Sequence, residues 1–332
     1  MPSGALRCFF GGIRHMWKYA AKRIVYMFVV FFIIVLMCFV LIRMLPLPTL
    51  PPSDPHTAVV MMRREAMGYN KPIMVQFGIF LKNVITKFDW GLSENLYFGQ
   101  ECWSIFRQKL PATIIVNLYS IILSIPIGIL LGIFAALKKN TWIDYSLSTL
   151  TMVVISVPSF VYAFVIQYIL CYKLQWFPFV MKSGNDWFSL AMFKSMIPAV
   201  LALSFGVIAG FTRTTRAELV EVLGSEFMLL ARTKGLTKAQ ATMRHALRNC
   251  FVVIVPSIIG EFIGIIGGSL IIERIFSIPG IGALTLNSIN GLDYNIFMLS
   301  TCFYTIIGLA ANLVVDISYG FIDPRIRMGA KK

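Results

Sequence analysis

Charged residues are scarce in this chain. Only 14% of its 332 residues are Asp, Glu, Lys or Arg, whereas soluble domains contain about 25%. Hydrophobic residues make up 58% of the sequence. Such a composition excludes an ordinary water-soluble globule and indicates an integral membrane protein.

The residues that usually build metal sites and enzyme centres are also few. The three histidines (His15, His56 and His245) lie far apart, and the six cysteines form no CxxC pair. This spacing excludes a structural zinc site, so we expect no metal. The sequence has no GxSxG motif, which argues against a membrane enzyme with a serine nucleophile. It also has no Gly-Lys-Ser or Gly-Lys-Thr, so we expect no phosphate-binding loop for ATP hydrolysis.

Six long apolar runs are present. A helix rises about 1.5 Å per residue, so about 20 apolar residues cross the hydrocarbon core of a bilayer. Five runs contain no charged residue, and the sixth is interrupted only by Glu261. No cleavage site of small residues follows the first run, which is therefore predicted to be a retained span. The pattern predicts an all-α membrane protein with six transmembrane helices, over 24–42, 110–137, 145–172, 195–212, 249–272 and 294–315.

The formal net charge is +15, but the basic residues do not form a nucleic-acid-binding face. They occupy short segments between the apolar runs, as the positive-inside rule describes. The side that holds both chain ends carries 18 of the 30 Lys and Arg residues. Most of the remaining 12 belong to one long segment, whose charges count little. Both termini are therefore predicted to be cytoplasmic, and no nucleic acid partner is expected.

These spans divide the chain into five parts. They are a cytoplasmic segment over 1–23, a first transmembrane helix over 24–45, an extracytoplasmic loop over 46–109, helices two to six over 110–320 with a cytoplasmic segment over 213–249, and a cytoplasmic tail over 321–332. The long external loop begins with five prolines and continues with aromatic residues, so we expect it to fold over the outer mouth. Cys102 and Cys171 are expected on the outer side as two free thiols rather than a disulfide.

The cytoplasmic segment 213–249 contains two predicted helices with a turn at Gly235. Thr237 and Gln240 fit a capping box, which predicts that a helix begins there and runs to Arg248. Two interpretations of this short basic helix are equally good at this point. It transmits force to a partner protein, or it lies on the membrane surface against anionic lipid.

Two strings in this segment resemble the cytoplasmic signature of membrane subunits of ATP-binding-cassette importers. They are Ala231-Arg-Thr-Lys-Gly235-Leu236 and Arg244-His-Ala-Leu-Arg-Asn249. More motifs resemble the same family in the same order: Arg43-Met-Leu-Pro46, Lys71-Pro72, Val75-Gln76, Leu110-Pro-Ala-Thr113, Gly267-Gly-Ser, Ile278-Pro-Gly-Ile-Gly282, Asp293-Tyr294, Asp316 and Asp323-Pro-Arg-Ile-Arg327. Together they identify a B-type permease subunit of the oligopeptide/dipeptide/nickel branch over residues 16–329.

The sequence departs from this family in two places. Members commonly place Gly-Asp-Pro after the first span, where this chain has a proline-rich run from Pro46 to Pro55. The wider importer signature often begins Glu-Ala-Ala, where this chain has Leu229-Leu230-Ala231. Because of the second departure, this chain lacks the Glu side chain that would otherwise be assigned an acidic contact.

The resemblance implies the type I importer permease fold, with no covalent chemistry and no cofactor in this chain. It implies that the segment around Gly235 is the coupling helix. The implied partners are a second homologous permease, two cytoplasmic ATPase subunits that hold ATP and Mg, an extracytoplasmic substrate-binding protein and the lipid bilayer. The residues assigned to ATPase coupling are Ala231, Arg232, Lys234, Gly235, Leu236, Thr237, Arg244, His245, Ala246, Leu247, Arg248 and Asn249.

Residues of the fifth span are candidates for the translocation pathway. A carboxylate within a span is costly and usually faces a cavity or a partner, so Glu261 either contacts the substrate or serves helix packing. Gly264, Gly267 and Gly268 form a small-residue face that permits close helix contact or leaves room for substrate. Asp316 is expected to pair with Arg325 or Arg327 at the surface, and His245 to serve docking or packing rather than pH sensing.

The predicted function is the membrane subunit of an ATP-driven importer of oligopeptides. Importers of dipeptides or nickel chelates are alternatives within the same family. A secondary ion-coupled transporter is the alternative outside it, but such proteins usually need several acids near the midplane and often have two related halves. Only Glu261 meets the first condition, and no internal repeat is evident.

Overall fold

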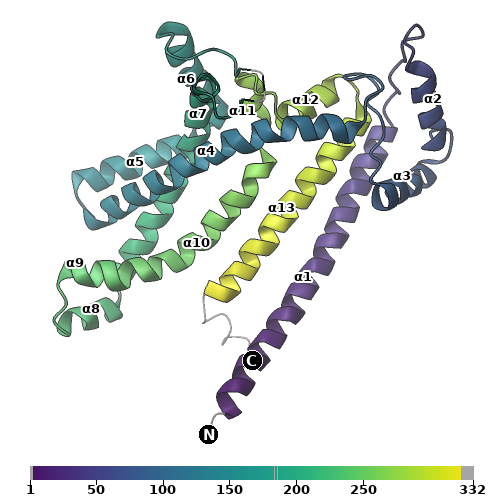
Figure 1. The fold of residues 1–332 in the computed structure, drawn as a ribbon. Helices are drawn as coiled ribbons and strands as arrows, with labels where there is room; N and C mark the ends of the chain where they lie inside the picture. Colours follow the sequence, from purple (N-terminus) through teal and green to yellow (C-terminus); the bar gives the residue numbers. More distant parts are fainter. Residues whose placement is uncertain (1–2, 183, 185, 323–332) are drawn as a thin grey trace. The chain divides into compact units, whose positions relative to one another are not determined.

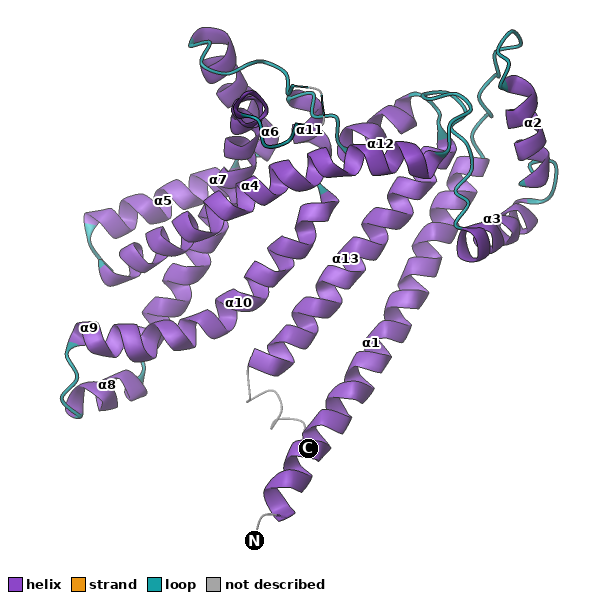
Figure 2. Ribbon diagram, in the orientation of Figure 1, coloured by secondary structure: helices purple, strands orange, loops and turns teal. Residues whose placement is uncertain are grey.

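The computed structural model describes residues 3–182, 184 and 186–322. Figure 2 shows helices joined by loops throughout this part of the chain, and no strand occurs in it. The all-α expectation is confirmed. The helices, labelled in Figure 1, are α1 Ser3–Arg43, α2 Thr57–Ala66, α3 Ile73–Lys87, α4 Cys102–Leu137, α5 Trp142–Ser156, α6 Ser159–Ile166, α7 Leu190–Leu223, α8 Glu226–Thr233, α9 Lys238–Ala241, α10 Leu247–Gly264, α11 Leu270–Ile275, α12 Ile281–Asn290 and α13 Tyr294–Ile322.

Five helical stretches are long and apolar enough to cross a membrane. They are Ala21–Arg43, Cys102–Leu137, Leu190–Leu223, Lys238–Gly267 and Tyr294–Ser318. Five of the six predicted spans are therefore confirmed as long apolar helices. Several extend beyond the predicted ends, because polar residues join the same helices outside the apolar window.

The predicted third span, 145–172, is not one straight helix. The stretches Trp142–Ser156 and Ser159–Lys173 meet at an angle of 99°. Pro158 explains the break, because a proline lacks the backbone N–H and disfavours helical geometry in the residue before it. Val157 accordingly has extended backbone angles, and the second stretch ends as a π-helix over Gln167–Lys173.

The predicted fifth span was wrong at its C-terminal end. It ends in a short 3-10 helix, Ile265–Gly267, rather than continuing to Ile272. Gly268 then takes a positive φ of 62°, which right-handed helices do not allow. The residues after it form α11, which packs against α12.

The chain divides into two compact units. The first contains the described residues within 1–21, 116–265 and 311–332, and the second contains 22–115 and 266–310. In the first unit, α7 packs against α5, α6 and α10. Gly128 and Gly132 allow α4 to approach α7 closely, since a Cβ at either position would lie under 3.0 Å from α7 backbone oxygens. A partly buried ion pair between Arg216 on α7 and Asp144 on α5 joins these two helices, with Nη2 and Oδ2 2.7 Å apart.

The second unit contains the segment 46–109 and its two helices, α2 and α3. One apolar core joins the end of α1 (Val35, Phe39, Ile42) to α3 and α13 through Phe77, Phe80, Tyr294, Met298 and Cys302. Another joins the start of α4 to α12 and α13 through Cys102, Ile105, Phe106, Ile281, Leu284, Ile296 and Leu299. The long segment is therefore a folded part of the second unit. Cys102 and Cys171 are both free and buried.

Candidate functional site: an exposed basic segment and buried polar clusters

The predicted coupling segment begins where α7 ends at Leu223. The helix α8 follows directly, and its Met228 and Ala231 are buried. The other side of α8 is apolar but exposed: Phe227, Leu229 and Leu230 have 38%, 64% and 56% of their surface accessible. An eight-residue helix outside the long spans thus exposes large apolar side chains, which is costly in water.

The turn after α8 is built by glycine and threonine. Gly235 has a φ of 88°, a conformation that glycine adopts without steric cost. The predicted capping box is confirmed. The Gln240 amide N–H donates to Thr237 Oγ1 at 3.3 Å, and Gln240 Oε1 accepts from the Thr237 amide at 3.1 Å. These bonds satisfy backbone donors at the start of α9 and orient it next to α8, as Figure 1 shows.

The predicted helix after the turn is also confirmed, and it continues into the fifth span. The α9 helix passes through a π-helical stretch, Thr242–Ala246, into α10. Small side chains point inward: Ala241 and Ala246 are fully buried. The cations Lys238, Arg244 and Arg248 are exposed.

The structure sorts the twelve predicted coupling residues into two groups. Exposed are Arg232, Lys234, Gly235, Thr237, Arg244, His245, Arg248 and Asn249. Buried or half-buried are Ala231, Leu236, Ala246 and Leu247. None of the four arginine and lysine side chains of the exposed group pairs with a carboxylate in the part of the chain that the structure describes. The exposed group therefore carries uncompensated positive charge.

The exposed apolar residues of this segment were not predicted from the sequence. Phe227, Leu229, Leu230 and also Met243, with 69% of its surface accessible, lie among the cations. A signal was present, since Leu229 and Leu230 occupy the positions of Glu and Ala in the wider importer signature. We call Phe227, Leu229, Leu230, Met243 and the eight exposed coupling residues the docking segment.

The predicted pathway residues have three different environments. Glu261 on α10 is half-buried, and its carboxylate has no hydrogen-bond or ion-pair partner among the described residues. A Cβ at Gly264 or Gly267 would meet nothing within 4 Å. A Cβ at Gly268 would lie 2.6 Å from the Glu273 carboxylate and 2.7 Å from the Thr113 side chain, so this glycine serves close packing.

Glu273 is a buried acid that was not predicted as a site residue from the sequence. Its carboxylate accepts from the Thr113 hydroxyl at 2.8 Å and from the amides of Gly282 and Ala283 at 2.8 and 3.1 Å. Thr113 Oγ1 in turn accepts from the Ile281 amide at 2.9 Å. Glu273 and Thr113 thus satisfy the first amides of α12, where a negative charge is favoured. The motif around Ile278-Pro-Gly-Ile-Gly282 contained the signal, because its glycines leave room for a carboxylate.

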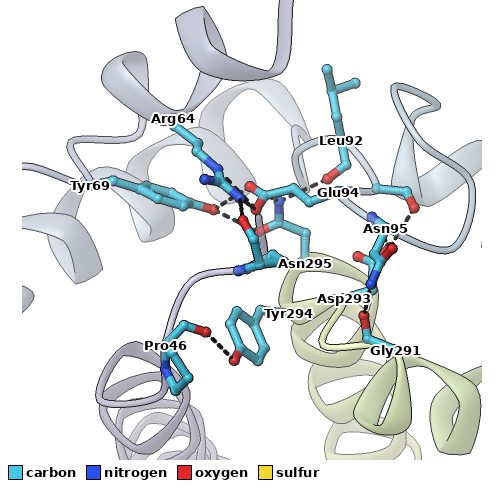
Figure 3. Close-up of polar contacts among 12 residues, drawn as sticks. Pro46, Arg64, Tyr69, Leu92, Glu94, Asn95, Gly291, Asp293, Tyr294 and Asn295 are labelled. Carbon is cyan, nitrogen blue, oxygen red and sulfur yellow. Dashed lines mark hydrogen bonds and ion pairs between the residues drawn. The ribbon is translucent and has the colours of Figure 1, made fainter. Parts of the chain in front are cut away.

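A second buried cluster lies at the end of α1 and the start of α13 (Figure 3). Arg64 pairs with Glu94, with Nη2 and Oε2 2.7 Å apart, and the Tyr69 hydroxyl donates to Glu94 Oε1 at 2.8 Å. Burial, and after it the charge of Glu94, raises the pKa of Tyr69 to about 12. The guanidinium of Arg43 lies 3.8 Å from the centre of the Tyr69 ring. The arginine of the Arg43-Met-Leu-Pro46 motif therefore makes a cation–π contact with Tyr69.

The first turn of α13 contributes two residues to this region. The Asp293 carboxylate accepts from the Ser93 hydroxyl and from the amides of Asn95 and Leu96 at 3.2 and 3.1 Å. Asn295 donates to the Leu92 carbonyl at 2.8 Å. Figure 3 shows these contacts between the 92–95 segment and the start of α13. The Asp293-Tyr294 motif therefore anchors the long loop.

The last of the predicted residues is Asp316. Asp316 lies on α13, but its expected partners Arg325 and Arg327, like the rest of Asp323-Pro-Arg-Ile-Arg327, lie outside the described residues. Within the residues that the structure describes, no three His, Cys, Asp or Glu side chains are grouped as a metal site would require.

Comparisons with known proteins agree with the sequence resemblance. The family described as "Binding-protein-dependent transport system inner membrane component" matches residues 128–328. The dipeptide transport system permease protein DppB of Lactococcus lactis subsp. cremoris is 34% identical over 315 residues, which cover 94% of this chain and 100% of that protein. The oligopeptide transport system permease proteins OppB of Haemophilus influenzae and Escherichia coli K12 are 31% and 33% identical, with 94% of this chain and 100% of each relative covered.

A solved amino acid ABC transporter with histidines gives a TM-score of 0.48 at 18% identity, covering 65% of this chain and 94% of that chain. The family assignment rests on the family match and on the full-length relatives, and not on this solved structure. This chain is a multi-pass membrane protein that belongs to the family of binding-protein-dependent transport system inner membrane components.

Proposed function

We propose that this chain is the membrane-spanning subunit of an ATP-driven importer of oligopeptides. Relatives named as dipeptide and oligopeptide permeases match it from end to end, which supports a peptide substrate. The chain has no phosphate-binding loop of the Gly-Lys-Ser/Thr kind, so ATP hydrolysis is assigned to other subunits of the complex.

The working complex contains this chain, a second homologous permease, two cytoplasmic ATPase subunits and an extracytoplasmic binding protein. ATP and Mg bind on the ATPase subunits. Closure of the ATPase pair moves the docking segments of both permeases, and the permease pair alternates between inward-open and outward-open states. Both chain termini are cytoplasmic, in agreement with the greater number of Lys and Arg residues on that side.

The docking segment is the observation that carries this proposal. It exposes Leu229 and Leu230 beside cations, outside the hydrophobic part of any span. Exposed apolar side chains within a charged rim are typical of protein–protein interfaces. The Gly235 turn and the capping box fix the shape of the segment before it meets a partner, which lowers the entropic cost of binding.

The test is ATP-driven peptide uptake in proteoliposomes that contain all subunits and the binding protein. We expect Gly235→Asp, Arg244→Glu and Leu230→Asp to lower uptake at least ten-fold while ATP hydrolysis no longer responds to substrate. Lys139→Glu is the control, because Lys139 is exposed on another loop of the same expected side. Normal amounts of each variant subunit in the membrane are required.

Two outcomes contradict the proposal. Uptake driven by an ion gradient without ATP would overturn the importer assignment. Full coupling of ATP hydrolysis to uptake in all three variants would overturn the role of the docking segment in coupling. Coupling of ATP hydrolysis to uptake can also change with the anionic lipid content of the proteoliposomes but not with the three substitutions. In that case the segment lies on the membrane surface.

We further assign Glu261, Gly264 and Gly267 to the translocation pathway. Glu261 has no partner within the described chain, and the space beside both glycines is open. A carboxylate in this position attracts the positively charged amino terminus of a peptide. Glu261→Gln should therefore reduce uptake of peptides with a free amino terminus more than uptake of amino-acetylated peptides. Unchanged uptake and selectivity would remove Glu261 from the pathway.

A further inference from the structure

The second unit contains a cavity of about 230 Å³ that the proposed mechanism does not use. It lies between the start of α4, the turn that joins α11 to α12, and Tyr97 of the long loop. Its volume is several times the roughly 30 Å³ that a water molecule occupies in the liquid. The cavity can therefore admit a side chain from another molecule.

Two cations line this cavity, Lys109 and Arg274. The Arg274 guanidinium donates to Asn287 Oδ1 at 2.7 Å, which holds it in place but does not neutralise it. The Lys109 ammonium lies 5.9 Å from the centre of the Tyr97 ring. Neither cation forms an ion pair with a carboxylate in the described part of the chain.

The one acid in the cavity wall, Glu273, is not available to these cations. It is only 2% exposed, and its carboxylate already accepts three hydrogen bonds, from Thr113, Gly282 and Ala283. The cavity therefore contains two positively charged hydrogen-bond donors, Lys109 and Arg274, and no carboxylate that pairs with them. A carboxylate supplies such acceptors, and a guanidinium binds it with matching geometry.

One wall of the cavity, the turn between α11 and α12, is closely packed. A Cβ at Gly280 would meet Glu273 and Thr113, and a Cβ at Gly282 would lie 2.9 Å from Glu273 Oε2. The α11–α12 turn is thus fixed against a buried carboxylate. Preformed sites bind with a lower entropic cost.

We propose that this cavity receives an aspartate or glutamate side chain of the extracytoplasmic binding protein. This inference rests on the proposed function. Tyr97 of the long loop lines the cavity, so the cavity lies on the same side of the membrane as the loop. That side is the one from which a binding protein approaches. Charge complementarity then selects an acidic side chain.

The test uses the reconstituted complex with binding protein and peptide, and measures the concentration of binding protein that gives half-maximal ATP hydrolysis. We expect the double variant Lys109→Glu/Arg274→Glu to raise this concentration at least ten-fold, with the maximal rate within two-fold of the original. Added salt should weaken the original complex and have less effect on the double variant.

Arg107→Glu is the matched control, since Arg107 is exposed on the same α4 turn region but does not line the cavity. The pair Lys109→Gln/Arg274→Gln provides a milder change if charge reversal reduces the amount of subunit in the membrane. It should give a smaller shift in the same direction.

Other results would overturn the inference. An unchanged half-maximal concentration in both double variants would show that the cavity does not bind the partner. A loss of preference for peptides with a free over an amidated carboxyl terminus, without that shift, would assign the cavity to the substrate. If the original complex shows no stimulation by any binding protein, the proposed function itself fails.

Discussion

Ser93 and Asp293 are 200 residues apart in the sequence and share a buried hydrogen bond. The bond joins the long loop between spans one and two to the first turn of the last span. Because the same carboxylate also accepts from two loop amides, the loop and the N-terminal end of α13 form one folded body. Any movement of that helix end will carry the loop with it.

Replacing Asp293 tests this anchor. Asp293→Ala leaves the Ser93 hydroxyl and the amides of Asn95 and Leu96 without their acceptor. Ser93 is fully buried, and a buried unsatisfied donor costs about 1–3 kcal/mol. We expect a lower melting temperature of the purified complex and faster proteolysis within residues 91–101. Asp54→Ala is the control, because Asp54 accepts one exposed amide, that of His56. Equal proteolysis of the two variants would contradict the anchor.

Gly280 and Gly267 offer a matched pair of glycine substitutions. A Cβ at Gly280 would press against the Glu273 carboxylate and the Thr113 hydroxyl, whereas a Cβ at Gly267 meets nothing within 4 Å. Overpacking of this kind costs about 1–3 kcal/mol. We expect Gly280→Ala to lower the melting temperature and Gly267→Ala to leave it nearly unchanged. The reverse order would show that the Glu273 cluster is not tightly packed.

The ionisation of Tyr69 is a test of the Arg64–Glu94 cluster. Its pKa is raised to about 12, so the folded protein retains this proton where the unfolded chain, with a tyrosine pKa of about 10, loses it. The stability contribution is fully present below about pH 10 and is lost as pH rises to about 12. Ultraviolet difference titration of the original protein against Tyr69→Phe should show this late ionisation. Glu94→Gln should shift it to lower pH, and the absence of any shift would contradict the contact.

The bent pair α5 and α6 gives a prediction about membrane topology. If it crosses the membrane once, Lys138 and Lys173 lie on opposite sides. We expect an impermeant thiol reagent to label Lys173→Cys in intact cells and Lys138→Cys only after permeabilisation. Both side chains are exposed, so burial does not interfere. Labelling of both positions from the same side would show that the pair is re-entrant, and the proposed orientation of the termini would then be wrong.

Local features were predictable from the sequence. The apolar runs, the Gly235 turn and the capping box of Thr237 and Gln240 all depend on residues within a few positions of one another. Hydropathy and short-range hydrogen bonding decide such features, so they hold whatever the rest of the chain does. Local rules indicate that Pro158 bends the chain, but they do not give the angle of 99°.

The buried polar clusters were not predictable in this way. Arg64 and Glu94 are separated by 30 residues and Thr113 and Glu273 by 160, and no periodic pattern relates them. The Asp293-Tyr294 motif marked the position of Asp293 without indicating its partners, and no motif contained Glu273. Likewise, nothing in the residue type separates Gly264, beside open space, from Gly268, which packs against a carboxylate.

The sequence by itself determined that this is a helical membrane protein of the importer permease family, with an exposed basic segment between its fourth and fifth spans. The tertiary structure alone decided which polar residues are buried together, where the fifth span stops and which apolar side chains of the docking segment stay exposed. The physical reason is the separation along the chain between the residues that interact. Helix formation and membrane insertion depend on neighbouring residues, whereas burial of a charge requires acceptors and donors brought from distant parts of the chain.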